Sequence, residues 1–152
     1  MKKILSKTMM LVALAATLLS FTIFGGEGFE IYLNNKVVMQ QYGKTDNAPK
    51  ALRLNQYAAN DELTVKYHHC GKVGKSRVIT IKDAQNRILR EWRYADAAQP
   101  VAPMVCKVKD ILSLSKGNET TLKLYYRSTE LTTDRMLTTL VIENNIVAKS
   151  GR

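Results

Sequence analysis

The chain of 152 residues has few of the residues that usually carry chemistry: two cysteines, two histidines and one tryptophan. Neither a G-x-S-x-G nor an H-E-x-x-H pattern occurs, so the sequence contains no recognisable hydrolase nucleophile or zinc-protease helix. A small envelope enzyme with a paired-carboxylate site stays an alternative, because such pairs are assembled in space. The composition therefore favours a protein that is not an enzyme, and nothing in it indicates a cofactor.

Long apolar runs are also scarce, and the single one extends from Met9 to Phe24. Three lysines precede it and two glycines follow, which is the order of a secretion signal. We expect residues 1–26 to be a signal peptide that exports the chain to the periplasm or the secreted space. An uncleaved membrane anchor is the alternative, because Ile23 is a poor residue near a cleavage point. Residues 27–152 then suit one domain.

The two cysteines lie in the part of the chain that we expect to be exported. Oxidising compartments drive thiols to disulfides, and an even number of cysteines allows complete pairing. We therefore predict a disulfide between Cys70 and Cys106.

Helical periodicity is nearly absent after residue 26, and period-two alternation recurs instead. Leu63, Val65 and Tyr67, for example, alternate with polar residues, as in a half-buried strand. The same alternation, with turn residues between the runs, predicts strands at 29–33, 36–42, 51–57, 62–69, 77–83, 87–94, 104–108, 119–127 and 136–143.

The inward positions of these strands give a candidate core. We expect the following side chains to be buried on the inner sheet faces: Leu63, Val65, Ile79, Ile81, Leu122, Leu124, Leu140 and Ile142.

The connections complete the expected architecture. Asn34-Asn35 suits a two-residue hairpin, residues 109–118 look like one short helix, and residues 95–103 read as a loop that crosses between sheets. The pattern resembles the immunoglobulin-like antiparallel sandwiches of secreted proteins, although Cys70, Trp92 and Cys106 echo the antibody pattern only loosely. We predict an all-β sandwich of about seven to nine strands.

Positive charge is concentrated in one stretch. Residues 66–93 contain eight basic side chains against two acids, which supplies +6 of the +7 that remain beyond residue 26. If these side chains form one surface, it would attract an anionic glycan, a lipid head group or an acidic envelope protein, whereas nothing indicates a nucleic acid. The contact candidates are Arg77, Arg87, Arg90, Trp92 and Arg93.

One cluster could hold a metal. His68 and Cys70 fall on the same face of a strand, and imidazole and thiolate are good ligands for copper or zinc. His69 would point to the opposite face, so a third ligand must come from elsewhere. A copper- or zinc-handling protein is thus an alternative to our main prediction, an exported, non-catalytic binding module whose ligand the sequence does not identify, with an anionic ligand favoured by the basic stretch.

Overall fold

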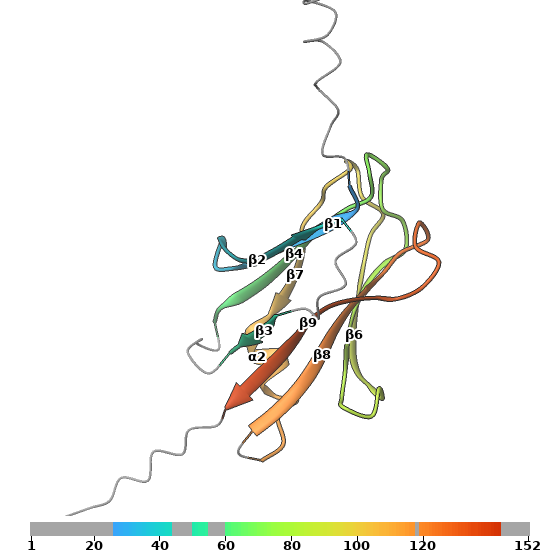
Figure 1. Cartoon of the computed structure of the whole chain (residues 1–152). Helices are drawn as coiled ribbons and strands as arrows, with labels where there is room; N and C mark the ends of the chain where they lie inside the picture. Colours follow the sequence, from blue (N-terminus) through green and yellow to red (C-terminus); the bar gives the residue numbers. More distant parts are fainter. Residues whose placement is uncertain (1–25, 44–49, 55–59, 118, 144–152) are drawn as a thin grey trace, which may run out of the picture.

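The computed structural model describes residues 26–43, 50–54, 60–117 and 119–143, and these form two β-sheets packed face to face (Figure 1). The first sheet has four strands and the second has five. The all-β sandwich is therefore confirmed. Its elements are β1 Gly28–Leu33, β2 Lys36–Tyr42, β3 Ala51–Arg53, β4 Glu62–His68, β5 Arg77–Lys82, β6 Ile88–Tyr94, β7 Met104–Lys107, α2 Val108–Leu112, β8 Glu119–Arg127 and β9 Arg135–Glu143.

The chain moves between the two sheets several times. The four-stranded sheet has the order β2-β1-β4-β7, and the five-stranded sheet has the order β3-β9-β8-β5-β6. All neighbours are antiparallel except β3 and β9, which are parallel. A purely antiparallel sandwich was therefore the wrong expectation at this one edge, where β3 joins after a crossover from the other sheet.

The strands lie close to the positions that alternation predicted. Each predicted strand is present, with ends that differ by one residue or not at all, except that residues 55–57 lie outside the described residues. The helix is shorter than expected, because Val108–Leu112 ends in turns that lead to Gly117 in the left-handed region. Residues 1–25 of the expected signal and residues 144–152 also lie outside the described part.

The Asn34-Asn35 hairpin is confirmed by its backbone. Both residues have positive φ, 49° and 66°, which is the conformation that a two-residue hairpin of type I′ needs. The Asn34 side chain also accepts a hydrogen bond from the main-chain N–H of Glu62 and donates one to Asp61. The turn is thus tied to the start of β4, the next strand of the same sheet.

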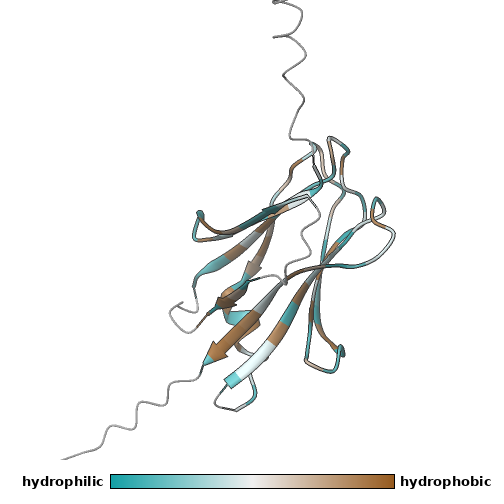
Figure 2. Ribbon diagram, in the orientation of Figure 1, coloured by the Kyte–Doolittle hydropathy of each residue, from teal (hydrophilic) through white to brown (hydrophobic). Residues whose placement is uncertain are grey.

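The space between the sheets is filled by apolar side chains from both. Figure 2 shows apolar residues recurring along the strands and hydrophilic residues in the loops. All eight predicted core residues are buried, so the inward positions assigned from sequence are correct. Within the described ranges no helix is long and apolar enough to cross a membrane.

The predicted disulfide is wrong, because both cysteines are free. Cys106 of β7 is buried and stands opposite Leu63, at the start of β4. Cys70 lies seven residues beyond Leu63, in the exposed turn that follows the far end of β4. At about 3.4 Å per residue the two are roughly 20 Å apart, whereas a disulfide requires Cα atoms within about 7 Å.

Candidate functional site

Arg77, a predicted contact residue, is buried inside the sandwich. It shares the inward face of β5 with Ile79 and Ile81, and the residue is only 7% exposed. Its guanidinium donates from Nε and Nη2 to the Ala95 carbonyl, at 3.0 and 2.8 Å, and from Nη1 to the Ala102 carbonyl at 3.0 Å. Arg77 thus holds the loop between β6 and β7 and is not a surface contact.

Arg90 and Trp92 lie on the inward side of β6, at the edge of the five-stranded sheet. Trp92 stands opposite Ile79 and packs against the core, and the Arg90 guanidinium lies 5.4 Å from the Trp92 ring centre. Arg90 also pairs with Asp110 of α2 at 3.3 Å. Both residues therefore fasten the β6 edge to the opposite layer.

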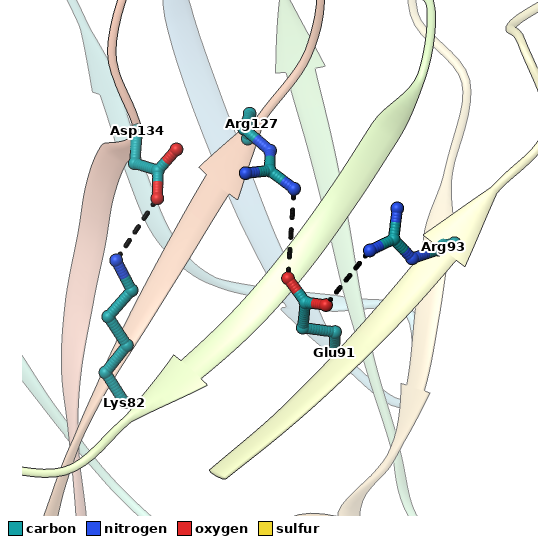
Figure 3. A network of polar contacts seen from close by, with 5 residues as sticks. All are labelled: Lys82, Glu91, Arg93, Arg127 and Asp134. Atoms are coloured by element: carbon teal, nitrogen blue, oxygen red, sulfur yellow. Dashed lines mark hydrogen bonds and ion pairs between the residues drawn. The ribbon is translucent and has the colours of Figure 1, made fainter. Parts of the chain in front are cut away.

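Arg93 belongs to the outer face of the five-stranded sheet, where charges form a network (Figure 3). Glu91 lies between Arg93, at 3.2 Å, and Arg127, at 3.8 Å, while Lys82 pairs with Asp134 at 3.1 Å. Each of these cations thus faces a carboxylate.

The predicted basic stretch is consequently divided among several surfaces. Its members lie in the core, at the β6 edge, on the outer face and in the hairpin after β5. Of the five contact candidates, the structure brings Arg90 and Trp92 together and separates the others. The prediction that these residues bind a ligand stays a prediction, but they do not form one patch.

Arg87 lies at a hollow of the surface. A cleft of about 360 Å³ opens between the hairpin that joins β5 to β6 and the segment that leads from α2 into β8. Leu89, Leu114 and Leu122 give it an apolar floor, and Arg87 and Lys116 stand at its rim with other polar residues. Small-molecule sites usually measure ~300 to 1,000 Å³ and combine these two features. We therefore treat this cleft as the candidate functional site and call it the hairpin cleft.

The cleft side of the hairpin is fixed by Asp83. Its carboxylate accepts the main-chain N–H of Arg87 at 2.9 Å and the Arg87 Nε–H at 2.7 Å. Partial burial acts against ionisation, but these hydrogen bonds outweigh it and keep the pKa of Asp83 below its usual value. Because the contact uses Nε, the terminal Nη groups of Arg87 remain to meet a ligand, and its side chain is 72% exposed.

The opposite rim is fixed by Thr120. Its hydroxyl donates to the Lys116 carbonyl at 2.9 Å and accepts the Lys116 N–H at 2.8 Å. Ser115 donates to the same hydroxyl at 3.0 Å. Lys116 is therefore held at the backbone while its ammonium group stays exposed. Sequence reasoning missed Lys116, because nothing in its spacing shows that it lies across a cleft from Arg87.

The two histidines lie on opposite faces, as alternation predicted. His69 is buried with Nε2 2.9 Å from the Tyr126 hydroxyl, and burial lowers its pKa. His68 faces outward, 3.7 Å from Glu30, and Cys70 stands in the turn beyond. No group of three or more His, Cys, Asp or Glu side chains suited to a metal occurs in the described part of the chain.

Comparison with known protein families and with characterised proteins finds no match for this chain.

Proposed function

We propose that the protein is an exported, non-catalytic binding module that takes a small anionic ligand, or an anionic end of a larger one, in the hairpin cleft. The observation that carries the proposal is the cleft itself, in which an apolar floor lies beneath two exposed cations held by ordered hairpin and turn contacts. Such a site gives area for an apolar contact and charge for orientation, and neither requires a catalytic group.

The preference for an anion rests on which charges remain available. Asp83 forms an ion pair with Arg87 through Nε, so these two charges offset each other and Lys116 supplies the cation at the rim that is not part of that pair. Arg87 keeps its Nη donors, which form a fork suited to carboxylate, sulfate or phosphate. Lys116 adds a second cation, and Glu119 on the same rim favours a ligand that also carries a hydroxyl or amine donor.

Two further predictions belong to the same proposal. Export depends on residues 1–26, with the segment acting as a signal peptide in the periplasmic or secreted setting expected above. The immunoglobulin-like type is supported by strand neighbours: β9-β8-β5 follows the G-F-C order of that fold, and β1-β4-β7 follows A-B-E. By the same lettering the hairpin cleft lies between the C–C′ and E–F connections, at the end opposite the B–C and F–G loops that serve recognition in antibody domains.

Retention on a heparin column tests the cleft with an anionic glycan. Arg87→Ser and Arg93→Ser are matched variants, because their side chains are 72% and 71% exposed and each is paired with one carboxylate. Each removes one charge, so unspecific attraction falls equally in both. We expect Arg87→Ser to elute at clearly lower salt than Arg93→Ser, with unchanged thermal unfolding in both. Equal elution of the two variants would show that heparin senses net charge and not the cleft.

A further inference from the structure

A second group of side chains lies on the outer face of the four-stranded sheet, away from the hairpin cleft. The register places Tyr42 of β2, Gly28 of β1 and His68 of β4 in one row across the sheet. Gln40, Glu30 and Lys66 form the next outward row, on the same three strands. The position of these rows is fixed by main-chain pairing, so the group is part of the rigid sheet.

Tyr42 is held against the sheet by three contacts. A Cβ atom at Gly28 would lie only 2.5 Å from Cδ1 of Tyr42, which means that the ring lies directly over the bare glycine. The ring also meets His68 edge-on, with centroids 5.4 Å apart, and its hydroxyl donates to Glu30. Even so, 44% of Tyr42 is exposed. We call this ring, supported by Gly28, His68 and Glu30, the Tyr42 platform.

Glu30 is the polar centre of the face. Its carboxylate accepts hydrogen bonds from the Tyr32 and Tyr42 hydroxyls, which keep its pKa below the usual value. Lys66 stands directly opposite on β4, and its ammonium lies 4.5 Å from the centre of the Tyr32 ring. The positive and negative charges at the centre of the face therefore balance, unlike those of the chain as a whole.

One polar atom of the platform has no partner. Nε2 of His68 is buried and makes no hydrogen bond within the described residues, since its 3.7 Å separation from Glu30 is too long for one. Buried polar atoms are nearly always paired, and an exception calls for a water or a ligand group. A small buried water would satisfy the nitrogen, because the atom has no exposed surface for a larger group to reach.

We propose that this face binds a neutral oligosaccharide, with one sugar ring stacked on Tyr42 and sugar hydroxyls bonded to Glu30 and Gln40. A pyranose ring has an apolar face that packs on an aromatic ring, and its hydroxyls both donate and accept hydrogen bonds. The balanced charge of Glu30 and Lys66 favours a neutral sugar over an anionic one. A sheet face four strands wide, about 15 to 20 Å across, has room for several sugar units.

A protein partner fits this face less well. Stable protein interfaces bury roughly 800 Å² on each side around several apolar or aromatic anchors. Among the described residues the exposed large hydrophobics are Val37, Tyr42, Ile88 and Val105, and Tyr42 is the one aromatic ring in that set. Val37 and Val105 lie in a separate row of the same outer face, the row of Tyr32, so the sugar site is confined to the rows of Tyr42 and Glu30, where one ring stands among polar groups.

Affinity electrophoresis tests the proposal with defined probes. The full chain is run under native conditions through gels that contain β-glucan, xylan, mannan or dextran, with a polymer-free gel as reference. We expect retardation by at least one of these polymers. Tyr42→Ala should weaken the binding at least about tenfold, since aromatic anchors typically carry that much affinity. Tyr42→Phe, which keeps the ring but not its hydroxyl, should lose less.

The matched control is Tyr125→Ala. Tyr125 also lies on an outer sheet face, but its ring is covered by the Lys82 ammonium at 4.4 Å, so its removal should leave retardation unchanged. Gln40→Ala is a second variant of the face, exposed enough to leave the fold intact, and should weaken binding several-fold.

The proposal is overturned if no neutral polymer retards the wild type, or if the two tyrosine-to-alanine variants behave alike. If heparin retains the protein but no neutral polymer retards it, the proposal for the hairpin cleft is supported and the proposal for the Tyr42 platform is refuted. Retardation by a neutral polymer that is lost in Tyr42→Ala while heparin retention persists would support both sites.

Discussion

Replacing Arg77 by lysine separates a structural role from a surface contact, because the charge is kept and only the geometry changes. The Arg77 guanidinium donates three hydrogen bonds, two to the Ala95 carbonyl and one to the Ala102 carbonyl, from a nearly buried position. No carboxylate ion pair with Arg77 occurs within the described residues. A lysine has a single nitrogen, which cannot reach both carbonyls in the same way.

The cost follows from the hydrogen bonds that are lost. If lysine keeps one of the three, two bonds to a charged donor disappear, at about 1.5 kcal/mol each or more. We therefore expect Arg77→Lys to lower the free energy of unfolding by about 3 kcal/mol. Because whole domains are stable by only ~5 to 15 kcal/mol, this is a large fraction. For a domain of this size the melting temperature should fall by roughly 10 °C.

Urea and thermal unfolding, followed by circular dichroism, measure the effect. Arg93→Lys is the matched control, since the Arg93 side chain is 71% exposed and its ion pair with Glu91 lies at the surface, where such a pair contributes ~0 to 1 kcal/mol. The control should shift the midpoint little. An Arg77→Lys variant as stable as wild type would show that the Arg77 hydrogen bonds to Ala95 and Ala102 do not hold the loop.

Two further predictions concern groups that titrate or react. Burial raises the pKa of Cys106 to about 12 and keeps it protonated as a thiol. We therefore expect DTNB to react with one thiol, that of Cys70, in the folded protein and with a second one only after unfolding. If the unfolded, unreduced chain contained no reactive thiol, the two cysteines would be joined by a disulfide after all. Burial lowers the pKa of His69, so the unfolded chain takes up its proton at higher pH than the folded one, and stability should fall as the pH drops through about 6.5. In the His69→Gln variant the urea midpoint should change less between pH 8 and pH 5.5 than in the wild type. An equal change of the midpoint with pH in both proteins would contradict this.

Much of the fold could be predicted from sequence because its signals are local. Alternation such as that of Leu63, Val65 and Tyr67 reports burial of one sheet face, and it located the strands and the core. Asn34 and Asn35 tolerate positive φ, and that property marked the first hairpin. Neither signal depends on which strands are neighbours, so both can be used before the strand order is known.

The charged surface could not be predicted in the same way. It depends on which sheet face each charged side chain occupies, and on ion-pair partners that are far away in the sequence. Arg77 has the same parity as Ile79 and Ile81, so the inward direction of its side chain was in fact readable from the alternation. Counting charge along the chain ignored this signal. The pairing of Arg90 with Asp110 and of Lys82 with Asp134 joins separate segments, which no spacing rule reveals.

The disulfide failed for a related reason. Cysteine count and compartment say whether thiols can pair, but geometry decides whether they meet. Cys106 faces the core beside the Tyr94 hydroxyl, 3.2 Å away, and Cys70 stands in a tight turn at the other end of β4. The sandwich is thus held by its core and by the hydrogen bonds of Arg77 to the loop between β6 and β7, without a covalent crosslink between the two cysteines.

The ion pairs on the outer face of the five-stranded sheet bear on the two proposed ligand sites. Surface pairs such as Arg93 with Glu91 contribute little to stability, ~0 to 1 kcal/mol each, so stability alone does not account for them. Their stronger effect is to neutralise cations that would otherwise attract any anion. Arg87 is paired as well, with Asp83, but through Nε, so among the described residues its Nη donors stay open to the hairpin cleft, and Tyr42 keeps an exposed ring on the other sheet. Selective binding should therefore depend on these two places, and variants on the paired outer face should change net charge without changing ligand choice.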